Sequence, residues 1–416
     1  MKQQLTYIDL FAGAGGLSEG FINAGFNPVA HVEMDKAACY SLKTRVAYNH
    51  LKATDNLEHY IAYLKSEINR EKLYDAIPKE KLDSVINLAI GKANNQKIFA
   101  LIDERLLDQK VDLIIGGPPC QAYSLVGRAR SENGMKGDER NFLFLEYAKF
   151  LHKYKPKMFV FENVTGLHSA NKGGYLRHML LTFRNLGYEI KDFVVTARDF
   201  DVLQDRKRII LIGHRKDLML TGFDLNGNVN DYTVSVLLHD LPALQAGQGL
   251  DKYTGYVGPT NKYLDYSGIR GDIQIVTQHL GRAHTIQDKQ IYRIAIKKWN
   301  KNKERLDYND LPEELKTHAN REIFKDRFKV VAGDLNTSHT VVAHISKDGH
   351  YYIHPDIKQC RSLTVREAAR LQSFPDDYYF EAEREGMNRT AAFKQIGNAV
   401  PPLMAKRIAE EIRKYL

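Results

Sequence analysis

The chain has 416 residues, of which 43% are hydrophobic, so it can bury a large core, and its length suggests two or three domains. Lysine and arginine exceed aspartate and glutamate to give a formal charge of +9, which favours a polyanionic partner such as nucleic acid. A membrane span is excluded because no stretch of about 18 apolar residues occurs, and three cysteines are too few for a disulfide framework or a Cys-rich zinc site. Since no signal-peptide pattern begins the chain, we expect a protein of the reducing cytoplasm that binds no metal.

The first predicted elements form a β–α–β unit around a glycine-rich turn. Residues 7–11 are typical of a strand, residues 12–16 (Ala-Gly-Ala-Gly-Gly) of a tight turn, and a helix is predicted from Leu17. A second strand, residues 27–32, ends at Glu33. Glycines let a ligand approach the helix N-terminus, and a carboxylate at the end of the second strand can bond ribose hydroxyls. Because the turn lacks the spacing of a dinucleotide site, it favours a smaller adenosine ligand, with close helix–strand packing as the alternative.

Residues 50–110 are charged and carry apolar residues at helical spacing. No catalytic or ligand-binding pattern is evident in them. We interpret this span as an inserted helical subdomain whose charges face solvent.

The next feature is a cysteine placed directly after a predicted strand. An apolar run, residues 111–115, leads into Gly-Gly-Pro-Pro and then Cys120. The usual fate of a free cysteine is to be buried and inert. Here the glycines and prolines constrain the backbone instead of filling a core. This favours a thiol presented at the carboxyl edge of a sheet, where open α/β sheets bind their ligands.

Two further apolar runs complete the strand pattern. Residues 158–161 form a predicted strand that ends at Glu162, and residues 209–212 form another. The segment between Gly174 and Gly187 is typical of a crossover helix. Strands that alternate with helices predict an α/β fold with a mostly parallel sheet.

The polar residues that follow these strands suit one reaction as a set, although each alone is a weak signal. A thiolate such as Cys120 can add to carbon 6 of cytosine, which makes carbon 5 nucleophilic toward an electrophilic methyl group. The addition is easier if an acid, here Glu162, donates a proton or a hydrogen bond to ring nitrogen 3, and if a guanidinium, here Arg208, holds the ring carbonyl. A cytosine inside a duplex must first be flipped out. We interpret residues 121–140, which contain glycines and basic residues, as a lid over the flipped base, with a surface loop as the alternative.

The strand–helix alternation stops between residues 216 and 355. The segment is first rich in glycine and tyrosine and then more helical and basic. The basic part contains Arg293, Lys297, Lys298, Trp299, Lys301 and Arg305.

Six motifs in one order now carry a resemblance to a known family. They occupy residues 9–16, 117–121, 162–164, 204–208, 361–372 and 395–401. With these motifs the chain resembles the bacterial-type cytosine-5 DNA methyltransferases almost from end to end. Agreement at six motifs in order is far more specific than any single match.

The resemblance implies a fold class and a domain arrangement. It implies an α/β, Rossmann-like S-adenosylmethionine-dependent methyltransferase fold with a mostly parallel sheet, plus a smaller mixed target-recognition domain. The catalytic domain would cover residues 1–215, with the helical insertion at about 50–110. Residues 216–355 would recognise the target, and residues 356–416 would return to complete the catalytic domain.

The resemblance also implies the roles of individual residues. Cys120 would be the nucleophile and Glu162 the acid, while Arg206 and Arg208 would position the catalytic loop and the base. S-adenosylmethionine would stack its adenine on Phe11 and bond its ribose to Glu33. The full set of implied cofactor residues is Phe11, Ala12, Gly13, Gly15, Gly16, Leu17, Glu33, Met34, Pro119, Leu143, Asn398, Ala399 and Val400.

One departure from the family pattern concerns the adenine. The family commonly has an acidic residue at a strand end between the ribose carboxylate and the nucleophile, where it bonds the adenine amino group. In this chain that interval holds the predicted helical insertion. Asp103 and Asp108 are candidates, but both fit a helix surface, so the adenine contact stays unassigned.

The implied partner is double-stranded DNA. We expect a stand-alone bacterial or phage enzyme, monomeric and associated with the nucleoid through DNA, that protects host DNA from a cognate restriction endonuclease. Methylation of tRNA, which one branch of the family performs, is the enzymatic alternative. The length of the recognition segment favours DNA. A DNA-binding regulator on an inactive methyltransferase fold is the other alternative, although such a protein would be expected to have lost Cys120 or Glu162.

Overall fold

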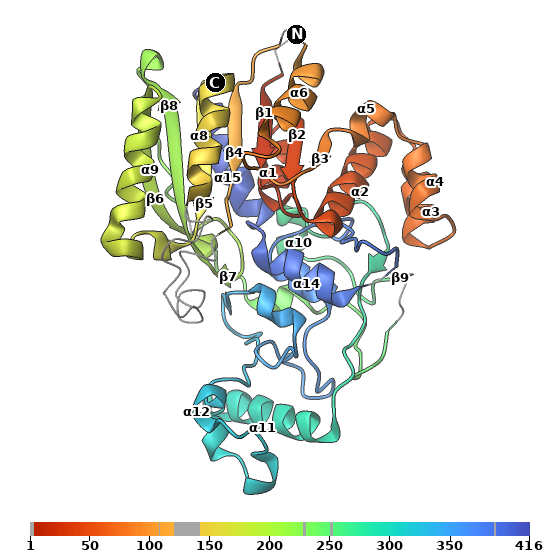
Figure 1. Cartoon of the computed structure of the whole chain (residues 1–416). Helices are drawn as coiled ribbons and strands as arrows, with labels where there is room; N and C mark the ends of the chain where they lie inside the picture. The colour runs from red at the N-terminus through yellow and green to blue at the C-terminus, as the bar shows by residue number, and fades with distance from the viewer. Residues whose placement is uncertain (1–3, 108, 120–141, 228–229, 250–252, 387) are drawn as a thin grey trace.

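The computed structural model describes residues 4–107, 109–119, 142–227, 230–249, 253–386 and 388–416. The chain folds into a sheet flanked by helices and a less regular second part that contains α10 to α12 (Figure 1). Among the described residues, no helix combines the length and apolarity needed to cross a membrane.

A seven-stranded sheet lies at the centre of the first part. Its strand order is β3-β2-β1-β4-β5-β8-β6. The bounds are β1 Thr6–Leu10, β2 Asn27–Glu33, β3 Val85–Asn87, β4 Leu113–Gly116, β5 Met158–Asn163, β6 Tyr188–Thr196 and β8 Lys207–Arg215. The first five strands of this order pair in parallel, and β8 runs antiparallel to both of its neighbours. The prediction of an α/β fold with a mostly parallel sheet is therefore confirmed.

Helices cover both faces of the sheet, which explains why the central strands are continuous apolar runs. One face packs against α6 Asn95–Leu106, α8 Leu143–Tyr154 and α9 Gly174–Asn185. The other face packs against α1 Gly16–Asn23 and α15 Pro402–Arg413. Helices α1 and α15 lie so close that a Cβ on Gly20 would be 2.3 Å from the backbone nitrogen of Lys406. The last helix of the chain thus packs directly on the first.

The span from residue 50 to residue 110 is only partly as expected. It contains the end of α2 Lys36–Ala53, then α3 Leu57–Leu64, α4 Arg70–Asp75 and α5 Lys79–Leu82. The expectation of an entirely helical insertion is wrong for Val85–Asn87, which form β3 in parallel register with β2. The helix after it, α6, packs on the sheet. A three-residue strand is too short to show a period of its own, so the flanking helical pattern hid it.

The second part has short elements joined by long irregular segments. Its helices and strands are β9 Tyr253–Thr254, α10 Lys262–Ser267, β10 Val276–Thr277, α11 Ile286–Asn302, α12 Arg321–Phe324 and β11 Ser338–His339. Strand β11 pairs with β7 Gln204–Asp205, and α13 Val365–Leu371 and α14 Arg389–Asn398 follow. Single-turn 3₁₀ helices occur in both parts of the chain. They lie at Thr165–Leu167, Ala170–Gly173, Ala197–Asp199, Lys216–Leu218, Val234–Leu237, Tyr308–Asp310, Glu313–Leu315 and Ala343–Ser346.

One hydrophobic core joins this second part to the end of the chain. Val234, Leu237 and Tyr263 share it with residues of α13 and α14. The segment after residue 356 therefore packs against residues between 216 and 355 before α15 returns to the sheet. The exact domain boundaries stay a prediction.

Helix α13 also carries a buried charge network, which gives a stability prediction. Arg370 is fully buried and donates to Asp240 at 2.6 Å and to Asp376 at 2.6 Å. Replacing Arg370 by alanine would remove the nearest cation from two buried carboxylates, which would keep only the more distant Arg270 and Arg366. We therefore expect a loss of about 3–5 kcal/mol in the free energy of unfolding. Urea unfolding would measure it.

The matched control is an exposed ion pair, Lys52 with Asp272 at 3.0 Å. Lys52→Ala should change the free energy of unfolding by less than about 1 kcal/mol, because water already solvates both charges. If Arg370→Ala were no more destabilising than Lys52→Ala, the network would not stabilise the fold.

Candidate active site

The predicted site residues converge because parallel strands present their carboxyl ends at one edge of the sheet. Strand β1 ends just before Phe11, β2 ends at Glu33, β4 ends just before Gly117, and β5 contains Glu162 near its end. Register places these ends side by side in the order β2-β1-β4-β5. The sequence prediction of a site at this edge agrees with the strand geometry.

The glycine turn after β1 is shaped by close packing on one side and open on the other. Gly15 adopts φ 76° as the residue before α1, a conformation that favours glycine. A Cβ on Gly16 would lie 2.3 Å from the carbonyl oxygen of Val400, whereas a Cβ on Gly13 would meet no atom within 4 Å. The turn therefore packs closely against Ala399 and Val400 at Gly16, whereas the space beside Gly13 is open. Ala12 and Leu17 are buried beside it, and Phe11 is half-buried.

Glu33 is held in one orientation by three backbone N–H groups. Its Oε2 accepts from Gly13 at 2.8 Å, and its Oε1 accepts from Met34 at 2.8 Å and Asp35 at 2.7 Å. Burial raises the pKa of Glu33 above its ordinary value, while the backbone donors oppose this change. Met34 beside it is 66% exposed.

Asp9 adds a second carboxylate close to the turn. It is 1% exposed, and its Oδ2 has no hydrogen-bond partner among the described residues. Burial, and then the neighbouring carboxylate of Glu33, raise the pKa of Asp9 well above its ordinary value. A fixed carboxylate, an orphaned carboxylate oxygen and an open turn at a helix N-terminus fit a ligand with ribose hydroxyls and a charged amino-acid part. The residues present therefore fit S-adenosylmethionine.

The remaining predicted cofactor residues border the same edge. Asn398 is exposed at the end of α14, and Ala399 and Val400 are buried where they adjoin the turn. Pro119 and Leu143 are half-buried and flank the segment that lies outside the described residues. Among the described residues, no group of three or more His, Cys, Asp and Glu could hold a metal ion.

Glu162 and Arg208, two predicted catalytic residues, form a close ion pair at the end of β5. The Nε of Arg208 donates to Oε1 of Glu162 at 2.6 Å, and both side chains are 13% exposed. A Cβ on Gly117 would lie 2.6 Å from Oε2 of Glu162. The next residue, Asn163, donates from Nδ2 to the carbonyl oxygen of Pro118 at 3.3 Å. Glu162 and Asn163 therefore lie directly against the segment that leads to Cys120.

Cys120 and the predicted lid, residues 121–140, lie outside the described residues.

Arg206 occupies a different environment from Arg208. It is fully buried and donates to the carbonyl oxygens of Val341 at 2.9 Å and Gly397 at 3.2 Å. Gln204 is buried beside it and accepts from the Val341 nitrogen at 2.9 Å. These two side chains tie together three segments that are distant in sequence. Arg206 can therefore position backbone, whereas Arg208 contacts a catalytic candidate.

The sequence prediction missed Asn87, the last residue of β3. Its Nδ2 donates to the carbonyl oxygens of Glu33 at 3.1 Å and Met34 at 3.0 Å. The candidate Asp103 instead accepts from the hydroxyl of Tyr154 at 3.1 Å and pairs with Lys153 at 2.8 Å. Asp103 thus belongs to the contact between α6 and α8, and Asp108 lies outside the described residues. The sequence does contain a signal for this strand, because Val85 and Ile86 before Asn87 are β-branched and favour a strand. The helical spacing of the surrounding apolar residues predicts a helix there instead.

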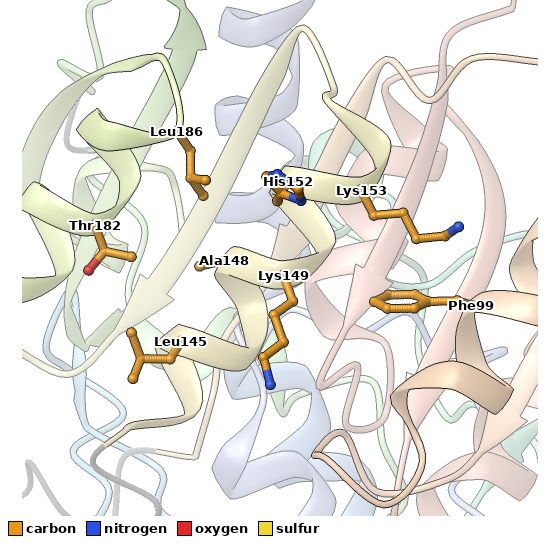
Figure 2. A pocket seen from close by; sticks show the side chains of 8 residues that line it. All are labelled: Phe99, Leu145, Ala148, Lys149, His152, Lys153, Thr182 and Leu186. Carbon is orange, nitrogen blue, oxygen red and sulfur yellow. The ribbon is translucent and has the colours of Figure 1, made fainter.

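A surface hollow elsewhere on the molecule is lined by none of the predicted catalytic or cofactor-binding residues. It lies among α6, α8 and α9 and is shown in Figure 2. Its lining residues are Phe99, Leu145, Ala148, Lys149, His152, Lys153, Thr182 and Leu186. The site at the sheet edge is therefore identified by its side chains and not by this hollow.

Comparison with known protein families gives a match over most of the chain. The family described as C-5 cytosine-specific DNA methylase matches residues 5–69 and 81–414. The chain belongs to this family. It is a DNA cytosine-5 methyltransferase, so the resemblance in the sequence motifs is confirmed. The unmatched residues inside the chain, 70–80, hold α4 and the beginning of α5.

Curated relatives and a solved structure agree with this assignment. The chain is 43% identical to the type II methyltransferase M.Bpa9945I of Bacillus paralicheniformis, and the match covers 99% of each chain. It is 31% identical to the type II methyltransferase M1.HphI of Haemophilus parahaemolyticus, covering 99% of this chain and 87% of the relative. A crystal structure described as a prophage-encoded DNA modification methyltransferase of E. coli has a TM-score of 0.64 at 22% identity, covering 99% of both chains. That likeness supports the fold.

Proposed function

We propose that this methyltransferase transfers a methyl group from S-adenosylmethionine to carbon 5 of a flipped cytosine in a specific duplex sequence, as the modification enzyme of a restriction–modification system. The curated relatives reported above are named as type II methyltransferases. The observation that carries the chemistry is the Glu162–Arg208 pair at 2.6 Å, next to the segment that leads to Cys120. Such a pair is suited to activating a ring that a thiolate attacks.

The proposed reaction uses three side chains. The Cys120 thiolate forms a bond to carbon 6, while Glu162 donates a hydrogen bond or proton to ring nitrogen 3. Bound S-adenosylmethionine supplies the electrophilic methyl group that carbon 5 takes up. Carbon 5 would then lose its proton to solvent water, ring nitrogen 3 would return its proton to Glu162, and the bond between carbon 6 and sulfur would break, which releases the Cys120 thiolate. The other product would be S-adenosylhomocysteine. Arg208 keeps the Glu162 carboxyl group in one orientation and adds positive potential where the ring gains charge.

Cofactor binding would use the open turn and the two strand ends beside it. Glu33 would accept from the ribose hydroxyls, and the turn from Gly13 to Leu17 with Asn398 to Val400 would hold the methionine part. Asn87 would take the place of the family's acidic residue. Its Nδ2 is already engaged by two carbonyl oxygens, so its Oδ1 is left as an acceptor for the adenine amino group.

This assignment predicts the effect of Asn87→Ala. Loss of one hydrogen-bond acceptor is worth about 1–1.5 kcal/mol, so the Kd for S-adenosylmethionine should rise by roughly tenfold. Isothermal titration with the intact protein would measure it. Asp103→Ala is the control and should leave the Kd unchanged, because Asp103 contacts Tyr154 and Lys153. Equal effects of the two substitutions would remove Asn87 from the site.

The substrate test uses purified protein, labelled S-adenosylmethionine, duplex DNA and tRNA. We expect label in DNA, at carbon 5 of cytosine, and bisulfite sequencing of DNA from cells that express the protein should give the target sequence. Label in tRNA alone would overturn the proposal in favour of a tRNA methyltransferase. DNA binding without transfer to either substrate would favour a regulator on an inactive fold.

A further inference from the structure

Helix α11, residues Ile286–Asn302, carries a stripe of basic side chains along one side. We call Lys289, Arg293, Lys297 and Lys301 the α11 stripe; they follow one another at intervals of four residues. At a rise of about 1.5 Å per residue, successive members are about 6 Å apart along the helix axis. Arg293, Lys297 and Lys301 are exposed, and Lys289 is half-buried.

The stripe lacks the acidic partners that neighbouring cations have. Within the described part of the chain, no ion pair or side-chain hydrogen bond involves any of its four members. Other cations in the same region are paired: Lys298 with Asp310, Lys303 with Asp334, Lys316 and Arg321 with Glu313, Lys325 with Asp307, Arg327 with Asp348 and Lys329 with Asp326. Among the described residues, many cations near α11 are therefore paired with an acid, whereas the four of the stripe, like Arg305 beyond the end of the helix, are not.

The stripe also opposes the stability of its own helix. Like charges four residues apart destabilise a helix by about 0.2–0.5 kcal/mol per pair. The one acid of α11, Asp288, is used at the N-terminus, where it completes a capping box with Thr285. It therefore neutralises none of the cations further along. Lys301 lies in the last turn, where the helix dipole favours a cation. An external anion would relieve the repulsion among the four cations.

Packing on the opposite side keeps the stripe facing outward. Ile291, Tyr292, Ala295 and Ile296 are buried in a core that also contains Leu306, Tyr308, Leu311, Leu315 and Phe328. This small core fixes how α11 is rotated about its axis. In Figure 1 the helix crosses the end of the second part farthest from the sheet. A rigid row of cations is thus presented at the outer end of the recognition segment.

We propose that the α11 stripe binds phosphates of the DNA backbone outside the sequence that is recognised, and so acts as a sequence-independent clamp on flanking duplex. The proposal rests on the proposed function, since DNA is the polyanion that the enzyme must hold. A duplex offers phosphates as a regular row of negative charge, which matches a regular row of cations. Contacts of this kind position a protein without reading bases.

The test compares two variants that remove the same number of charges. In the stripe variant, Lys289, Arg293, Lys297 and Lys301 all become glutamine. In the control variant, Lys79, Lys81, Lys92 and Lys97 become glutamine. These four are exposed, lie on or beside α5 and α6, and form no ion pair with any described residue. Circular dichroism should show both folded, because each change is on the surface and the stripe changes relieve repulsion.

The readout is the salt dependence of DNA affinity on a duplex several helical turns long with the target at its centre. Each lost phosphate contact lowers the slope of log K against log salt by about 0.9, so the stripe variant should lose about 3–4 units of slope. The control variant should keep the slope of the natural chain. On a short duplex trimmed to the target, the stripe variant and the natural chain should have the same slope. At saturating DNA and low salt, kcat of the stripe variant should be unchanged.

Three results would overturn the clamp. The stripe variant could keep the natural slope on long DNA, or both variants could lose slope equally, which would mean that only net charge matters. Loss of binding to anionic lipid vesicles with unchanged DNA binding would assign the stripe to a membrane surface. DNA affinity is measured without methyl transfer, so the two proposals can fail separately. Failure of the enzyme to methylate DNA would contradict the proposed function. The salt dependence of DNA affinity would still test the clamp.

Discussion

Replacing Cys120 by serine should abolish methyl transfer while DNA affinity stays close to that of the natural chain. A serine hydroxyl is hardly ionised near neutral pH and is a far weaker nucleophile than a thiolate, so carbon 6 would not be attacked. Transfer of a labelled methyl group to target DNA measures the first part, and a DNA-binding titration measures the second.

Cys360→Ser provides the matched control. Cys360 is a buried free cysteine whose Sγ donates to the carbonyl oxygen of Ile357 at 3.2 Å. A serine there can keep that hydrogen bond, so activity should persist. A Cys120→Ser enzyme that transferred methyl groups at the natural rate would rule out the thiolate route.

Replacing Glu162 by glutamine should slow the chemical step by about a hundredfold or more without unfolding the protein. Glutamine can still accept from Arg208, so the local geometry is retained, but it cannot transfer a proton to ring nitrogen 3. Single-turnover measurements with saturating DNA and cofactor would isolate this step.

The control for this change is Glu189→Gln on the outer strand β6. Glu189 is 63% exposed and lies 3.5 Å from His214, remote in the sheet from the ends of β1 and β2. Its replacement should leave the single-turnover rate unchanged. A Glu162→Gln enzyme within a few-fold of the natural rate would mean that Glu162 has no part in proton transfer.

The elements that the sequence predicted well share one physical property. Strands β4, β5 and β8 contain continuous buried apolar runs bounded by glycine, charge or turn residues, and the buried strand β1 contains Asp9 among its apolar residues. Such runs are recognisable without any neighbour. Their carboxyl ends carry the polar site residues, so the position of the site followed from the strands. Glu33 and Glu162 were both predicted from this position.

The missed elements depend on contacts that the sequence does not display locally. Strand β3 has three residues between charged helices, so its identity comes from pairing with β2, and Asn87 was missed with it. The motif at residues 204–208 predicts similar positioning roles for its two arginines, Arg206 and Arg208. Because β7 ends at Asp205 and β8 begins at Lys207, Arg206 lies between them and binds distant backbone, while Arg208 reaches Glu162.

The segment from residue 216 to residue 355 is the hardest part to predict for a related reason. Between residues 216 and 355 the described elements other than the 17-residue helix α11 are short, so periodicity gives little information. The stripe on α11 is an exception, since its four-residue spacing is visible in the sequence. Its lack of ion pairs, however, depends on where the neighbouring acids lie in the fold.

The most direct test of the catalytic account is to trap the bond between sulfur and the base. Duplex DNA that carries 5-fluorocytosine at the methylated position should form a stable covalent complex in the presence of S-adenosylmethionine, because fluorine cannot leave as the proton does. The account predicts a single crosslinked peptide containing Cys120 by mass spectrometry. Turnover of normal DNA by an enzyme that gives no such peptide would contradict it.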